Sequence, residues 1–124
     1  MIHPKYINVN RILGAMTFLI SFIVYFDTMA PSVSYWDCGE FIAVSYTLGV
    51  PHPPGSPLFL LLGRIASMLP ISEDIAFRVN LLSPLASAFS VLFLYFIIVQ
   101  LVNHWRGKIE TNTDALIAFG AGIV

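Results

Sequence analysis

Charge is the scarcest feature of this sequence. Only 10% of its 124 residues are Asp, Glu, Lys or Arg, whereas an ordinary soluble domain carries about 25%. Hydrophobic residues make up 57% of the chain, and the mean hydropathy is +0.82. The composition therefore predicts a membrane protein in contact with lipid. The net charge is −1 and no basic stripe is present, so no nucleic acid is expected as a partner.

Other absences narrow the chemistry. The single cysteine, Cys38, has no partner for an internal disulfide, so it says nothing about the redox compartment. No Cys/His set has metal-ligand spacing, and no glycine-rich loop could hold a nucleotide. No order of Ser, His and Asp supports a catalytic triad either. Neither a metal nor another cofactor is expected from these patterns.

Two long apolar stretches predict membrane-spanning helices. Residues 12–30 would form a helix roughly 28 Å long, close to the ~30 Å hydrocarbon core of a bilayer. Residues 79–102 form the second span, and a third begins near residue 115. A signal peptide is the alternative for the first stretch, but the stretch is long for one. Pro31 also directly follows Ala30, the best candidate for a cleavage site.

Two short amphipathic segments lie between the long spans. Residues 58–69 are too few to cross a bilayer, and their leucines recur at helical spacing, as do the apolar residues of 41–48. The prolines of 51–57 separate these segments by a rigid turn. The predicted fold is an all-α polytopic membrane protein, with two long spans, two short juxtamembrane helices and the start of a third span. Residues 1–124 are expected to be the N-terminal part of a larger transmembrane domain.

The distribution of charge predicts the orientation. Residues 27–78 contain five acidic residues against two arginines. The positive-inside rule then places the N-terminus in the cytoplasm and the loop 31–78 on the extracytoplasmic side. We expect an integral membrane protein, of a bacterial inner membrane. The basic residues that flank the spans are Lys5, Arg11, Arg106 and Lys108.

Two carboxylates stand at the start of the first short segment. Asp37 and Glu40 are three residues apart, so a helix would place them on one face. One interpretation is structural, a capping box with Asp37 at the N-cap and Glu40 at position N3. The other is chemical, a general base that takes a proton from an acceptor hydroxyl. The spacing alone fits both.

Four further residues are candidates for substrate binding. His52 precedes two prolines and is either an exposed turn residue or a hydrogen-bond partner of substrate or a carboxylate. Arg64 lies among leucines, where its guanidinium could extend to lipid headgroups or hold a phosphate. Arg78 and Asn80, at the start of the second long span, allow the same two interpretations.

Two motifs carry a resemblance to a known family. Residues 36–41, WDCGEF, and residues 48–58, LGVPHPPGSPL, resemble the N-terminal signature of the DUF2723 family. This family includes the transmembrane protein 260 type of protein O-mannosyltransferase. More distantly, the plan is similar to that of GT-C glycosyltransferases. The resemblance implies a lipid-phosphate-linked sugar donor, a catalytic Asp37 assisted by Glu40, and a pocket shaped by His52. It also implies that Arg64 or Arg78 meets the donor phosphate.

The expected function is that of a membrane glycosyltransferase. It would move a sugar from a polyprenyl-phosphate donor to a protein hydroxyl on the extracytoplasmic side. The alternative is a non-enzymatic polytopic membrane protein, a transporter or an assembly partner, in which Asp37 and Glu40 only cap a helix. The fragment alone is expected to be inactive, because a donor pocket needs more helices than these residues supply.

Overall fold

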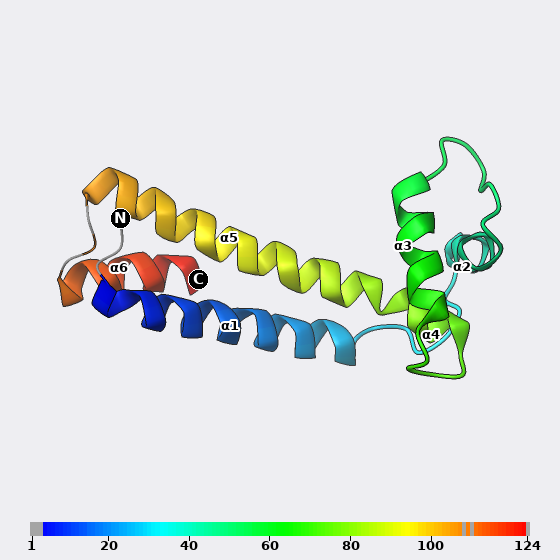
Figure 1. The fold of residues 1–124 in the computed structure, drawn as a ribbon, viewed down its shortest axis with the longest axis horizontal. Coiled ribbons are helices and arrows are strands. Elements are labelled where there is room, and N and C mark those ends of the chain that lie inside the picture. The colour runs from blue at the N-terminus through cyan, green and yellow to red at the C-terminus, as the bar shows by residue number, and fades with distance from the viewer. Residues whose placement is uncertain (1–3, 108, 110, 124) are drawn as a thin grey trace. The chain divides into compact units, whose positions relative to one another are not determined.

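The computed structural model describes residues 4–107, 109 and 111–123, and their regular structure is helical (Figure 1). The chain divides into two compact units. One contains the residues up to Tyr25 and those from Ser87 onward, and the other contains residues 26–86. The helices are, in chain order, α1 (Pro4–Asp27), α2 (Cys38–Thr47), α3 (Pro57–Met68), α4 (Ile75–Asn80), α5 (Leu82–Arg106) and α6 (Asn112–Ile123).

Helices α1, α5 and α6 pack around Tyr95 in the first unit. Its side chain is fully buried, and its hydroxyl donates to Oδ1 of Asn10 at 2.9 Å. A Cβ at Gly122 would lie 2.7 Å from the Tyr95 ring, and one at Gly14 would lie 2.9 Å from the Phe96 ring. These glycines therefore let α6 and α1 approach α5 closely, as small residues do between membrane helices.

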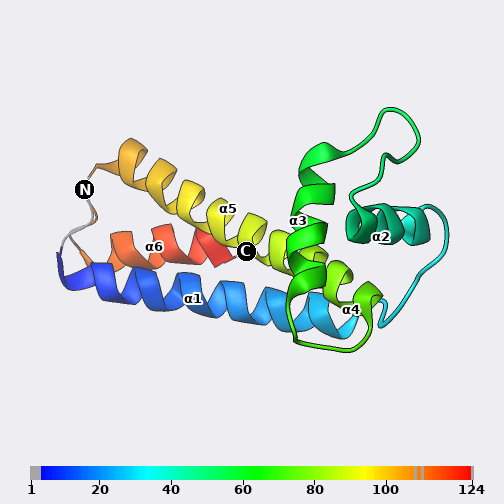
Figure 2. The ribbon, with the colours of Figure 1, turned by 45° about the vertical axis from the view of Figure 1, so that its right-hand side comes forward.

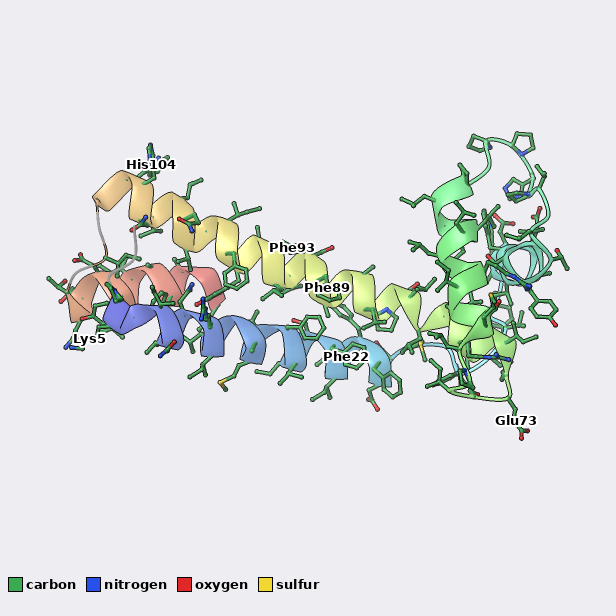
Figure 3. All side chains as sticks on the ribbon, in the orientation of Figure 1. Lys5, Phe22, Glu73, Phe89, Phe93 and His104 are labelled. Atoms are coloured by element: carbon green, nitrogen blue, oxygen red, sulfur yellow. The ribbon has the colours of Figure 1, made fainter. Side chains whose placement is uncertain are left out.

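The long helices keep much apolar surface outside this core. Aromatic rings join them along their length: Phe18 packs against Phe89 with ring centroids 4.8 Å apart (Phe22, Phe89 and Phe93 are labelled in Figure 3). Helix α1 and the stretch Ile75–Trp105 are long and apolar enough to cross a membrane, judged by length and composition. Little of either is buried within the described residues. The fold is compatible with an integral membrane protein.

The bounds of α1 and α6 differ from those of the spans expected near the two ends of the chain. Helix α1 covers residues 4–27 rather than 12–30, and α6 begins at residue 112 rather than near 115. The early end of α1 has a local cause, because Pro31 disfavours helical backbone at the residue before it. Lys108, one of the basic residues used to predict the orientation, lies outside the described residues.

Helices α2 and α3 cross at a point of close contact in the second unit (Figure 2). A Cβ at Gly63 would lie 2.8 Å from Cβ of Ser45 and 2.5 Å from its hydroxyl oxygen. The small core of this unit lies beside that contact, with Ile42, Ala76 and Val79 buried. The two short helices expected from the sequence are therefore confirmed, and their approach depends on the absence of a side chain at position 63.

A third short helix, α4, was not expected to be separate from the second long helix. The carboxylate of Asp74 caps α4 by accepting from the N–H of Ala76 at 2.8 Å. Helix α4 ends at Asn80 because Pro84 has no N–H to give to the Asn80 carbonyl, and its ring crowds that oxygen. Helix α5 then begins at Leu82. It lies within the stretch Ile75–Trp105 that is long and apolar enough to cross a membrane, and the expected start of the span at residue 79 stays a prediction.

The segment after α1 is fastened to α4 by hydrogen bonds. The side-chain amide of Asn80 donates to the carbonyls of Ala30, at 3.0 Å, and Ser32, at 2.9 Å. The Ser32 hydroxyl also donates to Asp74; this bond, followed by the one from the Ala76 N–H, lowers the pKa of that carboxylate. Within this unit, these bonds therefore hold residues 30–32, from which the chain continues into α2.

We predict that Gly63→Ala lowers the stability of the full-length protein. Replacing a helical glycine by alanine would ordinarily gain about 1 kcal/mol. Here the added Cβ would overlap Ser45, and overpacking of this kind costs about 1–3 kcal/mol. The melting temperature in detergent should therefore fall.

The control for this prediction is Gly120→Ala, since a Cβ at Gly120 meets no atom of the described residues within 4 Å. The double variant Gly63→Ala/Ser45→Gly should recover part of the loss, because it removes both overlapping atoms of Ser45. Equal melting temperatures for Gly63→Ala and Gly120→Ala would contradict the close contact.

Candidate functional site

Three polar side chains converge at the start of α2, two from its first residues and one from the turn that lies 12 residues after Glu40. Oε1 of Glu40 accepts a hydrogen bond from the backbone N–H of His52 at 2.8 Å, and Oε2 lies 2.7 Å from its ring Nδ1. On the other side of the ring, Nε2 of His52 is 3.9 Å from Oδ2 of Asp37. The imidazole therefore lies between the two carboxylates that the sequence singled out.

The contact between Glu40 and His52 shifts both titrations. Hydrogen bonds from the His52 ring, and then from its backbone N–H, lower the pKa of Glu40. The same side-chain hydrogen bond, followed by the negative charge of Glu40, raises the pKa of His52. The side chains of His52, Glu40 and Asp37 are 47%, 39% and 55% exposed, so water screens their attraction. The pair mainly fixes orientation.

Aromatic contacts hold the turn from the side. The ring centroid of Phe41 is 5.9 Å from that of His52 and 5.8 Å from that of Phe59, both in edge arrangements. Phe41 lies on α2 and Phe59 on α3, so the histidine ring rests on a wall built from both helices. These ring contacts and the two hydrogen bonds to Glu40 fix the position of the imidazole, although the charged side chains stay partly exposed to water.

A cavity of about 520 Å³ opens beside Asp37. Its wall is mostly apolar and includes two phenylalanines and a tryptophan, a lining typical of ligand sites with a few polar groups. Of the two carboxylates, Asp37 is the one in the wall, whereas Glu40 and His52 do not line the cavity. The lining residues are Trp36, Asp37, Cys38, Phe41, Ile42, Ser56, Phe59, Val79, Asn80 and Ser83.

The backbone just before α2 is strained. Trp36 has a φ of +67°, a left-handed conformation that is unfavourable for a residue with a large side chain. The residue is 93% exposed and lines the cavity. Strained residues of this kind cluster at functional sites, and here the strain turns the chain so that Asp37 enters the first turn of α2 beside the cavity.

The capping-box interpretation is wrong, although its positions are right. Asp37 does occupy the N-cap of α2, and Glu40 is the third helical residue. The backbone of Asp37, however, is helical (φ −74°, ψ −2°), and its side chain accepts no capping hydrogen bond. An N-cap normally has extended backbone, which aims its side chain back at the helix. Glu40 bonds to His52 instead of to the Asp37 N–H.

Arg64, predicted to reach lipid headgroups or a phosphate, contacts the end of α2. Its guanidinium donates to the Tyr46 carbonyl and lies over the Tyr46 ring, 5.4 Å from the centroid. A cation is favourable there, because the last carbonyls of a helix carry partial negative charge. Arg64 thus joins α3 to α2, and it does not line the cavity.

Arg78 and Asn80 are also engaged with main-chain carbonyls. The Arg78 guanidinium donates to the carbonyls of Ser67, Leu69 (3.2 Å) and Glu73 (3.4 Å), around the connection from α3 to α4. Asn80 lines the cavity, but its amide nitrogen serves the carbonyls described above. The structure thus brings Asp37, Glu40 and His52 together and places the two arginines elsewhere.

Sequence reasoning missed one property of this cluster. One ligand atom each from Asp37, Glu40 and His52 lies within 4.8 Å of the others, a grouping able to hold a metal ion. A search for Cys/His spacing could not find it, because the ligands come from a helix start and a turn 12 residues later. The only signal in the sequence was the pairing of an acidic motif with a proline-rich histidine motif.

The fold and the site define a class: a helical protein compatible with a membrane, with an acidic and histidine cluster beside an apolar cavity. The chain belongs to the family described as the protein O-mannosyl-transferase TMEM260 N-terminal domain, which matches residues 37–124. The match begins at Asp37. The family resemblance predicted from the two motifs is therefore confirmed.

Two relatives show how much of the protein is matched. The chain is 38% identical over 98 residues to protein O-mannosyl-transferase tmem260 of Dictyostelium discoideum, covering 77% of this chain and 12% of the relative. It is 37% identical over 86 residues to protein O-mannosyl-transferase TMEM260 of Mus musculus, covering 69% and 12%. The chain thus spans about an eighth of the length of these relatives. No solved structure matches it.

We predict that the ionic part of the Glu40–His52 contact depends on pH. The pKa of His52 is raised above 6.5, so its stabilising contribution is complete below that pH and is lost as pH rises through the folded-state pKa. The pKa of Glu40 is lowered below 4.5, so its contribution is lost as pH falls through the folded-state pKa. The contribution is therefore largest between pH 4.5 and 6.5.

The measurement compares melting temperatures of the full-length protein and its Glu40→Gln variant in EDTA, from about pH 5 to about pH 9. The wild type should have its small advantage near pH 6 and lose the ionic part of it at alkaline pH. Glu73→Gln, an exposed carboxylate away from the cluster, should show no such trend. A difference that grew with pH would contradict the assignment.

Proposed function

We propose that this chain carries the acceptor-activating part of a membrane protein O-mannosyltransferase. The full protein would move a mannosyl residue from a polyprenyl-phosphate carrier to a protein hydroxyl on the extracytoplasmic side. Family membership and the names of the two relatives support the reaction class. The single structural observation that carries the proposal is that Asp37 lines the cavity while a histidine and a second carboxylate hold the region around it.

Asp37 is the proposed general base. A hydroxyl is a weak nucleophile at neutral pH, and a carboxylate within hydrogen-bond reach can take its proton during attack. The hydroxyl oxygen forms the new bond to the anomeric carbon as the bond from that carbon to the phosphate oxygen breaks. The phosphate leaves with the bonding electrons, and the hydroxyl proton goes to Asp37. Positive charge builds on the sugar ring during this step, as in glycoside hydrolysis.

Glu40 and His52 are positioning residues in this scheme. The two hydrogen bonds from Glu40 fix the height and the rotation of the His52 ring. The ring then presents Nε2 to Asp37 at 3.9 Å. The assistance expected of Glu40 therefore acts through the histidine.

The binding of donor phosphate by Arg64 or Arg78 stays a proposal. Each guanidinium would have to exchange a main-chain carbonyl for a phosphate oxygen, because both are engaged in this way in the folded unit. Such an exchange would be favourable, since a guanidinium can form hydrogen bonds with two oxygens of a phosphate at once. Asn80 is better placed than either arginine, because it already lines the cavity.

The predicted orientation belongs to the same proposal. The positive-inside rule puts the unit of α2, α3 and α4 on the extracytoplasmic side, where protein acceptors of a lipid-linked sugar would be exposed. The bacterial inner membrane expected from the sequence stays a prediction. We also propose that transfer needs the rest of a full-length protein, since the relatives are about eight times longer than the matched segment.

The alternative, a non-enzymatic transporter or assembly partner, loses its structural argument. It required Asp37 and Glu40 to serve as a helix cap, and neither side chain makes the capping bond.

We predict that Asp37→Asn in the full-length protein reduces transfer by about 10²- to 10⁴-fold, the usual contribution of a general base. The amide keeps the shape of the side chain but cannot take the proton. The measurement is sugar transfer in membranes from a labelled polyprenyl-phosphate mannose to a protein acceptor. Glu73→Gln serves as the matched control and should leave the rate unchanged.

Because Asp37 makes no capping bond, the melting temperature of the Asp37→Asn protein should stay close to that of the wild type. Transfer at the parental rate would show that Asp37 is not the base. A large fall in melting temperature would instead support a structural role.

A further inference from the structure

We propose that Asp37 and His52 hold a divalent metal ion at the edge of the cavity, with Glu40 orienting the imidazole. The proposal deepens the function above, because it rests on Asp37 facing a substrate cavity. It departs from the expectation, drawn from sequence spacing, that no metal is involved. Three features of the site support the ion: the orientation of the histidine, the spacing of its second ring nitrogen from Asp37, and the charge of the cavity wall.

The orientation of His52 matches that of a metal-binding histidine. Such residues nearly always direct the other ring N–H at a carboxylate or carbonyl, which fixes the tautomer and the ring plane. Glu40 accepts at Nδ1 of His52 at 2.7 Å and also binds the backbone N–H of the same residue. The second nitrogen, Nε2, then carries the lone pair, and it faces Asp37.

The spacing on that side suits a bridging ion better than a direct bond. Nε2 and Oδ2 of Asp37 are 3.9 Å apart, which is too long for a hydrogen bond. Metal–nitrogen and metal–oxygen distances are each about 2.0–2.2 Å, so an ion placed between the two atoms spans about 4 Å. Moving the side chains about half an ångström closer would reach a tetrahedral angle. Both groups are about half exposed and therefore accessible to an ion.

The ligand types narrow the choice of ion. One imidazole and one carboxylate form a mixed set, whereas Mg²⁺ and Ca²⁺ favour oxygen ligands alone and thiolates are needed for soft ions. The set fits Mn²⁺ or Zn²⁺. With two protein ligands, the remaining positions face water and the cavity that Asp37 lines, where a phosphate oxygen could bind.

The charge of the cavity wall indicates what such an ion would do. Among the described residues, no Lys or Arg lines the cavity, and Asp37 is the one acidic residue in its wall. A leaving phosphate needs positive charge nearby as the bond to the sugar breaks. A bound cation would supply it through one phosphate oxygen. It would also lower the basicity of Asp37, so its benefit must come from the leaving group, while Oδ1 of Asp37 remains for the acceptor proton.

The test is Mn²⁺ binding to the full-length protein, stripped with EDTA and followed by the loss of the free-ion EPR signal. His52→Gln is compared with His104→Gln, an exposed histidine of α5 that belongs to the other compact unit (labelled in Figure 3). The wild type and His104→Gln should bind one ion that His52→Gln does not. Glu40→Gln has one acceptor oxygen in place of two, so it cannot accept both hydrogen bonds from His52. It should weaken binding by roughly 10- to 100-fold.

The transfer assay then separates this proposal from the function. Stripped enzyme should lose transfer and regain it with Mn²⁺ or Zn²⁺, and His52→Gln should need far more metal for half-maximal rate. Equal Mn²⁺ binding by His52→Gln and His104→Gln would overturn the metal site, as would undiminished transfer after stripping; both leave the transferase function standing. A protein that binds Mn²⁺ through His52 but transfers no sugar under any condition would keep the site and remove the function.

Discussion

The pair of hydrogen bonds between Glu40 and His52 is the constraint on which the site depends. The first bond binds the backbone of the turn, and the second binds the ring. Together they close a loop from the first turn of α2 to the proline-rich segment, and they leave Asp37 as the carboxylate that faces the cavity. Because the groups are half exposed, these bonds contribute more to geometry than to stability. The chemistry proposed for Asp37 follows from that geometry.

The helices around the site are held by close packing at small residues and by hydrogen bonds to main-chain carbonyls. Gly63 lets α3 lie against Ser45 of α2, and Arg64 fastens the same two helices at the adjacent residue, through the Tyr46 carbonyl. Arg78 and Asn80 tie the connecting segments by their carbonyls. Arg64, Arg78 and Asn80, which were candidates for ligand binding, therefore hold the helices and their connections together. These contacts explain how short helices support the site although few residues of this unit are buried.

The sequence predicted the elements of this fold better than the contacts of the site. Apolar runs and helical spacing located α1, α5, α2 and α3, because burial or lipid contact imposes a period on each segment. The separate α4 required knowing that Pro84 would break the helix at Asn80 and not merely bend it. The contact of Glu40 with His52 could not be predicted, since the direction of the turn depends on contacts such as Phe41 with Phe59. The capping box failed because spacing does not reveal backbone angles.

The conformation of Trp36 has a consequence for what enters the cavity. Glycine would adopt a φ of +67° with less strain, by about 1–2 kcal/mol. The indole returns little of this cost through packing, because 93% of its surface is open. The flat face of the indole is therefore open to stacking, and the C–H face of a pyranose ring or an aromatic acceptor side chain would fit against it. A ring stacked there would lie beside Asp37, which lines the same cavity.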